Sequence, residues 1–346
     1  MASVQTHILA FGLKRQKFFS GEKIDPVGLR MQIERMASKA PAPRHIRVVA
    51  IAADSVPGEW LIPPEAPQDR ALLYIHGGAW FMGSTTTHRS LVARLATAGG
   101  VRALSIDYRL APEHPFPAGL EDCITAYEWL LRNGIAPDKI VVAGDSAGGN
   151  LTLALLIALR DAGRPLPAGA VAISPATDLT FSGESYTARA HLDPFFSEIG
   201  NLGSNTIVAD YVTDHDPRDP LISPLFADLR GLPPLLLHVG DHEALLDGVV
   251  GFGERAVAAG VAARTVVWPG MFHVFQMFAA ILPEARRANA QIATFIRSRL
   301  DAGQAGTGNI DAGQAGTHPE GSEGPVLLST AGEELVQGGE GIVQQG

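Results

Sequence analysis

Short apolar segments rich in Val, Ile, Leu and Ala alternate along the chain with longer segments in which apolar positions recur every three to four residues. The first pattern is typical of strands buried on both faces, and the second of amphipathic helices. We expect strands at 46–52, 59–62, 71–75, 101–106, 140–143, 170–173, 235–239 and 264–267. We expect helices at 86–98, 118–132, 147–161, 244–259 and 285–300. The alternation predicts an α/β fold with a mostly parallel, eight-stranded central sheet flanked by helices.

Two segments interrupt this rhythm. Residues 1–42 have helical periodicity but precede the first strand, and residues 182–218 carry Gly, Pro and aromatic residues in place of a strand and a helix. Ligands of open parallel sheets bind at the carboxyl ends of the strands. We therefore expect both segments to form a helical cap over that edge, with 43–300 as the catalytic domain. Ordinary surface packing is the rival interpretation.

The C-terminal residues 301–346 have a different composition. The heptapeptide Asp-Ala-Gly-Gln-Ala-Gly-Thr at 301–307 recurs at 311–317, and the remainder is rich in Gly, Glu, Gln and Ser. Such a segment buries too little apolar surface to offset its ordering entropy. We expect a flexible extension without a catalytic role, and a cloning remnant would explain the repeat.

The charge balance is acidic, with 27 Lys and Arg residues against 36 Asp and Glu residues and a net charge of −9. This balance argues against nucleic acid and against stable membrane association, and it favours a neutral small molecule as partner. The single cysteine, Cys123, falls in an expected helix, where a buried inert thiol is the usual role. A chain without an intrachain disulfide is compatible with the reducing cytoplasm, so we expect a cytoplasmic protein.

The pentapeptide Gly-Asp-Ser-Ala-Gly at 144–148 joins the apolar strand 140–143 to the helix 147–161. A Gly-x-Ser-x-Gly sequence between a strand and a helix forms a sharp turn that exposes the serine hydroxyl. The helix beginning there directs its N-H groups towards the position where an oxyanion would form. The motif predicts Ser146 as a nucleophile, against the alternative of a plain tight turn.

A glycine pair, Gly77 and Gly78, follows the strand 71–75. Because glycine lets the backbone approach a ligand closely, this loop is a candidate oxyanion hole. We expect the donors to be the N-H groups of Gly77, Gly78 and Ala147. The preceding residue, His76, is expected to have a structural role in the loop.

Four motifs carry a resemblance to a known family. They are His-Gly-Gly-Ala-Trp at 76–80, Asp-Tyr-Arg-Leu-Ala-Pro-Glu at 107–113, Gly-Asp-Ser-Ala-Gly-Gly-Asn at 144–150 and Asp-Pro-Leu-Ile-Ser-Pro-Leu at 219–225. In this order, between about residues 44 and 300, they resemble the hormone-sensitive lipase family of microbial esterases, bacterial family IV. The resemblance implies an α/β-hydrolase fold with an N-terminal helical cap, cofactor-free hydrolysis of short- to medium-chain acyl esters, and often a homodimer. Ala79 stands where many relatives carry a third glycine, which leaves its N-H group unchanged.

A serine nucleophile needs a base and an orienting acid, which follow it along the chain in this fold in the order acid, then histidine. His273, in the sequence Trp-Pro-Gly-Met-Phe-His-Val-Phe at 268–275, resembles the family's catalytic-histidine loop. Both Asp241 and Glu243 follow the strand 235–239. The residues 243–247 match the family's Asp-Pro-Leu-x-Asp pattern with Glu in the first position, which favours Glu243. Asp241 remains the alternative acid.

These residues predict a serine carboxylesterase that forms an acyl-enzyme and needs neither a cofactor nor a metal. An amidase, a peptidase or a lactone hydrolase would use the same triad. A non-catalytic ligand receptor could share the fold, but the presence of Ser146 and His273 disfavours it. Six aromatic residues near the motifs belong either to an apolar acyl pocket or to the core: Trp80, Phe81, Phe195, Phe196, Phe272 and Phe275.

Overall fold

A computed structural model describes residues 2–15, 25–39, 45–196, 206–302 and 326–328. Its centre is a nine-stranded sheet in the order β1-β2-β4-β3-β5-β6-β7-β8-β9. The strands are β1 Arg47–Ala53, β2 Val56–Ile62, β3 Ala71–Ile75, β4 Arg102–Ile106, β5 Ile140–Asp145, β6 Gly169–Ile173, β7 Leu235–Gly240, β8 Ala263–Trp268 and β9 Val326–Leu328. The eight expected strands are all present, and the α/β prediction is confirmed.

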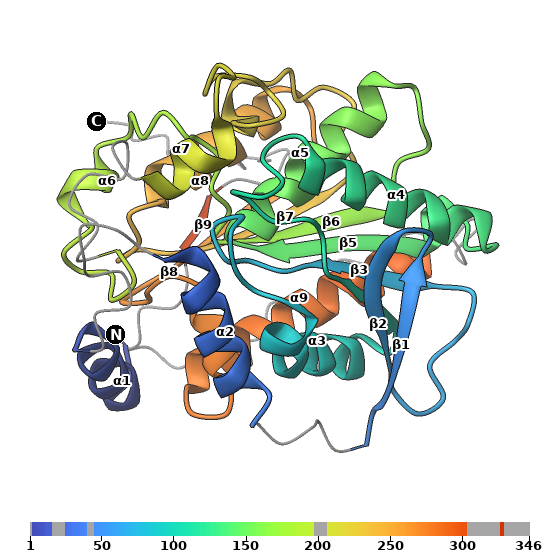
Figure 1. The fold of residues 1–346 in the computed structure, drawn as a ribbon, viewed down its shortest axis with the longest axis horizontal. Helices are drawn as coiled ribbons and strands as arrows, with labels where there is room; N and C mark the ends of the chain where they lie inside the picture. Colours follow the sequence, from blue (N-terminus) through green and yellow to red (C-terminus); the bar gives the residue numbers. More distant parts are fainter. Residues whose placement is uncertain (1, 16–24, 40–44, 197–205, 303–325, 329–346) are drawn as a thin grey trace, which may run out of the picture.

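Helices cover both faces of the sheet (Figure 1). The helices α4 Ala118–Arg132, α5 Ala147–Asp161 and α8 Leu246–Ala258 lie on one face, and α3 Thr85–Gly99 and α9 Pro283–Ala302 lie on the other. Each layer packs its apolar side chains against the strands in its own buried cluster. The central strands β3, β5, β6 and β7 are therefore buried at every residue, whereas the edge strand β1 is largely exposed.

Strand direction places the functional loops at one edge. The six strands from β3 to β8 run parallel to one another, whereas β2 is antiparallel to β4 and β1 is antiparallel to β2 at one side of the sheet. The carboxyl ends of β3, β5, β7 and β8 consequently point the same way. The loops after these four strands carry the residues expected in the site.

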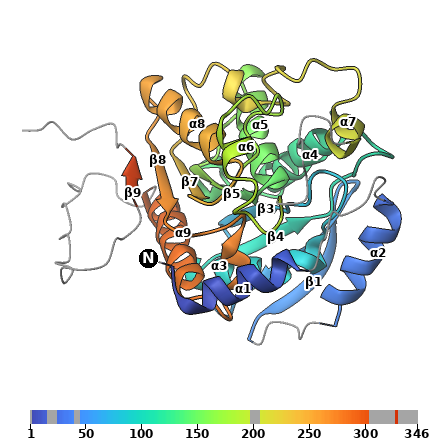
Figure 2. The ribbon, with the colours of Figure 1, turned by 90° about the vertical axis from the view of Figure 1, so that its left-hand side faces the viewer.

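The two segments outside the strand-helix rhythm contain the helices α1 Val4–Lys14, α2 Pro26–Ala37, α6 Ser185–Ala188 and α7 Thr206–Val212. Ser3 begins α1 as its N-cap, and its N-H donates to Glu284 of α9 at 2.7 Å, which fastens α1 to α9. Figure 2 shows α1 and α2 on the same side of the molecule as α3 and α9. Short 3₁₀ helices, η1 Pro137–Lys139, η3 Pro224–Phe226 and η4 Phe275–Phe278, complete the loops.

The C-terminal tail departs in part from its expectation. Asp301 and Ala302 complete α9, and Val326–Leu328 form β9, which pairs antiparallel with β8. An apolar Val-Leu-Leu triplet can pair with an open sheet edge even within a polar tail. Residues 303–325 and 329–346 lie outside the described residues, so the flexibility expected for them stays a prediction.

Cys123 is completely buried in α4, and burial raises the pKa of its thiol well above the ordinary value. The expectation of a buried thiol is thus confirmed, and the raised pKa disfavours the reactive thiolate. In the part of the chain that the structure describes, none of the helices combines the length and the apolar character needed to cross a bilayer.

Candidate active site

Ser146 occupies a strained turn between β5 and α5. Its φ of 53° and ψ of −119° are unusual for a residue with a side chain, and its N-H donates to the carbonyl of Ile173 at 2.8 Å. The turn is tight enough to require glycine nearby, because a Cβ on Gly148 would lie 2.1 Å from the carbonyl oxygen of Ile75. The geometry is that of a nucleophile turn, with the hydroxyl directed away from the backbone.

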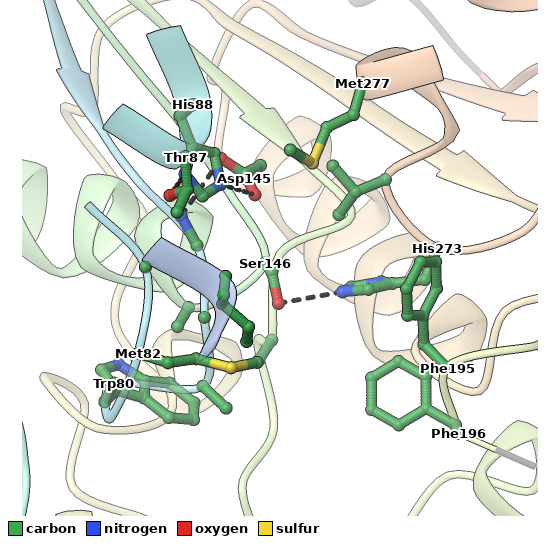
Figure 3. A pocket seen from close by; sticks show the side chains of 18 of the residues that line it. Trp80, Met82, Thr87, His88, Asp145, Ser146, Phe195, Phe196, His273 and Met277 are labelled. Carbon is green, nitrogen blue, oxygen red and sulfur yellow. Dashed lines mark hydrogen bonds and ion pairs between the residues drawn. The ribbon is translucent and has the colours of Figure 1, made fainter. Parts of the chain in front are cut away.

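Three loops bring Ser146, His273 and Glu243 together. The Oγ of Ser146 lies 2.9 Å from His273 Nε2 (Figure 3), and His273 Nδ1 lies 3.0 Å from Glu243 Oε2. Since a carboxylate can only accept, Nδ1 carries the proton and Nε2 is left as an acceptor for the serine hydroxyl. This tautomer is the one that a general base requires.

Glu243 is completely buried, and other groups hold its carboxylate in place. Its Oε1 accepts hydrogen bonds from the Ser174 hydroxyl at 2.8 Å and from the Gly240 N-H at 2.5 Å. The structure places Asp241 elsewhere: its Oδ1 accepts the Gly270 N-H at 2.6 Å, and its side chain is 34% exposed. Of the two candidate acids, Glu243 therefore lies against the histidine.

The surroundings of His273 favour its protonated form. Burial alone would lower the pKa of its imidazole, but the hydrogen bond to Glu243 and the charges of Glu243, Asp193 and Asp145 raise the pKa above 6.5. An imidazolium at this position is therefore stabilised.

The loop after β3 approaches the serine from the other side. Gly78 has a φ of 127°, and a Cβ there would lie 2.1 Å from the carbonyl oxygen of Met82, so only glycine fits. Gly77, Gly78 and Ala147 line the same pocket as Ser146. Ala147 is the first residue of α5, where N-H groups have no acceptor within the helix, whereas the Gly77 N-H donates to Asp145 Oδ1 at 3.2 Å.

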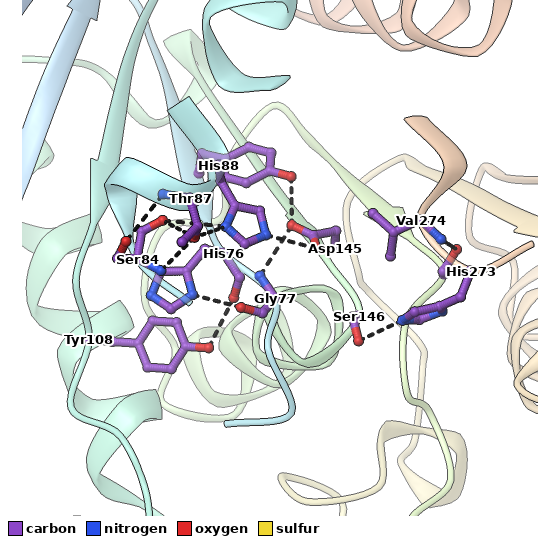
Figure 4. Close-up of polar contacts among 12 residues, drawn as sticks. His76, Gly77, Ser84, Thr87, His88, Tyr108, Asp145, Ser146, His273 and Val274 are labelled. Carbon is purple, nitrogen blue, oxygen red and sulfur yellow. Dashed lines mark hydrogen bonds and ion pairs between the residues drawn. The ribbon is translucent and has the colours of Figure 1, made fainter. Parts of the chain in front are cut away.

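A buried polar cluster joins this loop to the nucleophile turn (Figure 4). Asp145 accepts hydrogen bonds from the Tyr74 hydroxyl at 2.7 Å and from His88 Nε2 at 3.3 Å, besides the Gly77 N-H. Burial would raise the pKa of Asp145, but the charge and hydrogen bond of His88 lower it. Burial would lower the pKa of His88, but Asp145 raises it. These interactions favour the ionised forms of both side chains, a carboxylate on Asp145 and an imidazolium on His88.

His76 has the structural role expected of it. Its Nδ1 donates to the carbonyl of Gly77 at 2.8 Å, and its ring stacks on Tyr108 with centroids 4.4 Å apart. Burial and the neighbouring His88 charge lower the pKa of His76 to about 3. The side chain is therefore neutral and shapes the loop.

A cavity of about 300 Å³ opens over the serine. Side chains of α2, namely Leu29, Ile33 and Met36, line it together with residues of the 182–218 segment. Among the aromatic residues singled out in the sequence, Trp80, Phe195 and Phe196 line this cavity. Phe81, Phe272 and Phe275 do not line it and are buried in the protein interior. Both segments expected to form the cap thus contribute walls to the cavity.

The sequence did not indicate four polar residues of the site. Ser174 supports Glu243, His88 and Asp145 form the buried pair, and Asp193 contacts the backbone of His273. Asp145 was noted only as the variable residue of the serine pentapeptide. The other three follow no motif or spacing that would have identified them.

Comparison with known proteins identifies the family. The family model described as the alpha/beta hydrolase fold matches residues 72–277. The acetyl-hydrolase of Streptomyces hygroscopicus is 44% identical over 246 residues, which are 71% of this chain and 81% of that protein. An esterase of Acinetobacter venetianus is 39% identical over 274 residues, which are 79% of this chain and 89% of that protein.

Solved structures agree with the sequence comparison. The crystal structure of an esterase from the bacterial hormone-sensitive lipase family has a TM-score of 0.81 and 43% identity to this chain. The match covers 87% of this chain and 100% of that one. The chain therefore belongs to the α/β-hydrolase family, among the serine carboxylesterases that resemble bacterial hormone-sensitive lipases.

Proposed function

We propose that Ser146, His273 and Glu243 form a catalytic triad that hydrolyses esters of short- to medium-chain carboxylic acids through an acyl-enzyme. The supporting observation is the unbroken line of hydrogen bonds from the serine hydroxyl through the imidazole to a buried carboxylate. Each distance is within the range needed for proton transfer or for orienting the base.

In the first half-reaction, Ser146 Oγ attacks the ester carbonyl while His273 Nε2 accepts its proton. Glu243 stabilises the imidazolium through its bond to Nδ1. The tetrahedral intermediate then collapses, the alcohol leaves with the proton from Nε2, and the acyl group stays on Oγ. In the second half-reaction, a water gives a proton to Nε2 and attacks the acyl carbon. The carboxylic acid is released and Ser146 regains its proton.

We assign the negative charge of both intermediates to an oxyanion hole made of the Gly77, Gly78 and Ala147 N-H groups. Ala147 and Gly78 are the main donors, because the Gly77 N-H already donates to Asp145 Oδ1 and is less available to an oxyanion. The Asp145 bond instead anchors the loop at the right distance from the serine. Fixed backbone donors of this kind stabilise the transition state without reorganising.

The apolar walls of the cavity support a substrate with a hydrocarbon acyl or alcohol group. The acetyl-hydrolase name of a 44% identical relative supports the short end of the chain-length range. The net charge of −9 supports a neutral ester as substrate. The cap formed by 1–42 and 182–218, the homodimer and the cytoplasmic location remain proposals.

A panel of p-nitrophenyl esters from acetate to laurate, run beside p-nitroanilides, tests the proposal. We expect the highest kcat/KM between acetate and octanoate and little anilide cleavage. Ser146→Ala should lower kcat by about 10⁴- to 10⁶-fold. Near-normal turnover by Ser146→Ala would refute the assignment of Ser146 as the nucleophile. A preference for anilides would show that the protein is an amidase and not an esterase.

A further inference from the structure

A second buried carboxylate, Asp193, lies beside the triad and has no place in the mechanism above. It belongs to the segment between α6 and α7, and none of its surface is exposed. Its Oδ2 accepts a hydrogen bond from the backbone N-H of His273 at 3.2 Å, and its Oδ1 accepts one from the Phe195 N-H at 2.9 Å. A single side chain thus joins the segment over the cavity to the loop that carries the proposed base.

Two rings of the same segment pack against the imidazole. The Phe196 ring meets the edge of His273 with centroids 4.9 Å apart and planes at 75°, and the Phe195 ring does so at 6.4 Å and 70° (Figure 3). Edge-to-face aromatic contacts of this geometry are energetically favourable. Only Pro194 separates Asp193 from this aromatic pair in the chain. The two hydrogen bonds that Asp193 accepts therefore also position the rings.

The charged groups that face Asp193 are those of the triad. A carboxylate oxygen of Asp193, one of Glu243 and a ring nitrogen of His273 all lie within 4.8 Å of one another. Burial raises the pKa of Asp193 to about 7. The charge of His273 opposes this rise, and the charge of Glu243 adds to it. Asp145 is the further acid that acts on His273. An ionised Asp193 therefore stabilises the imidazolium, as Glu243 does.

We propose that Asp193 is a positioning residue for His273: it fixes the base through the backbone N-H and supplies a second negative charge to the imidazolium. The inference rests on the proposed role of His273 as general base. Asp193 links the segment over the cavity to catalysis. Displacement of that segment would remove the hydrogen bond to the His273 N-H, the negative charge beside the imidazole and both aromatic contacts together.

Asp193→Asn tests this role in the full chain. Asparagine keeps one acceptor oxygen, so its NH₂ group must face one of the two backbone N-H donors. We expect kcat to fall about 10- to 100-fold through misplacement of the base. We also expect the midpoint of the acid limb of kcat/KM to move down by about one pH unit, because the imidazolium loses a stabilising charge.

Asp178→Asn is the matched control. Asp178 is also buried, and its two oxygens accept the N-H groups of Thr180 and Ser182 in a similar turn, but no hydrogen bond joins it to His273. We expect this variant to keep the wild-type midpoint. A profile of Asp193→Asn that superimposes on the wild type, in both midpoint and kcat, would overturn the proposal. Activity lost in Ser146→Ala but kept in Asp193→Asn would overturn it while leaving the triad intact.

An NMR titration reads the ionisation of His273 directly. The His273 imidazole resonances, assigned by their absence in His273→Asn, should titrate with a lower midpoint in Asp193→Asn than in the wild type, because the imidazolium loses a stabilising charge. If the two midpoints agree, the charge of Asp193 does not act on the base and the proposal fails.

Discussion

Replacing Glu243 with glutamine removes one charge and one acceptor from the site while keeping the size of the side chain. In the native structure Oε2 accepts the His273 Nδ1-H, and Oε1 accepts the Ser174 hydroxyl and the Gly240 N-H. Glutamine has a single carbonyl oxygen. This oxygen can accept a hydrogen bond from His273 Nδ1, or it can accept those of the Ser174 hydroxyl and the Gly240 N-H, but it cannot do both.

The size of the effect follows from these bonds. If the oxygen serves His273, the Gly240 N-H is left buried against an NH₂ group, which costs about 1–3 kcal/mol. The imidazolium also loses a charged hydrogen bond worth about 1.5–3 kcal/mol. The first cost is present in the ground state and the transition state alike, so it lowers the free energy of unfolding and not kcat. The second cost arises only when the imidazolium forms, and it corresponds to a fall in kcat of roughly 10- to 100-fold. If the amide takes the other orientation, Nε2 carries the proton and cannot act as a base.

The assay is the initial rate with p-nitrophenyl butyrate at pH 8, corrected for the number of reactive serines. Asp241→Asn is the control, because the asparagine oxygen can still accept the Gly270 N-H, and we expect its rate within about fivefold of the wild type. The opposite ranking, with Asp241→Asn the more damaging change, would refute the assignment of Glu243 and transfer the role to Asp241.

Three further predictions concern the pH dependence, the buried pair and the cavity. Because the base must be neutral and the pKa of His273 is raised, kcat/KM should rise with pH and reach half its maximum above pH 6.5; a midpoint below pH 6 in rates from pH 5 to 9 would contradict this. Asp145→Ala leaves the His88 charge, the Tyr74 hydroxyl and the Gly77 N-H without their acceptor. We expect urea denaturation to show a free energy of unfolding lower by about 3–5 kcal/mol, and a loss below about 1 kcal/mol would argue against an ionised pair. Ile33→Trp adds bulk to the cavity wall formed by α2, so kcat/KM for the octanoate ester should fall at least tenfold more than for the acetate ester. Equal losses for both esters would show that α2 does not border the acyl site.

The sheet and its helices could be predicted because they depend on local patterns. Strands buried on both faces, such as β3, consist mostly of apolar residues, and the expected ranges of β3, α4 and α5 match the observed ones. β9 was missed since its pairing with β8 depends on a contact between distant parts of the chain, and the composition of the tail favoured irregular structure.

The site residues divide in the same way, into those that a local motif indicates and those that depend on contacts between distant parts of the chain. Ser146 and His273 lie in motifs whose spacing reflects the turns that hold them, so the sequence indicated both. The family pattern at residues 243–247 favoured Glu243, but Asp241 stayed an alternative because the pattern does not show where the two side chains of one loop point. Asp193 was missed because its role comes from a backbone contact across 80 residues. Contacts of this kind leave no periodicity in the sequence.

The most direct test of the account is to locate the covalent intermediate. A p-nitrophenyl alkylphosphonate should react once per chain, and mass spectrometry of the digested protein should place the phosphonyl group on Ser146. We expect activity to fall in proportion to labelling and the reaction to be much slower in His273→Asn. Complete inactivation with the label on another residue, or full labelling of Ser146 with activity retained, would contradict the account.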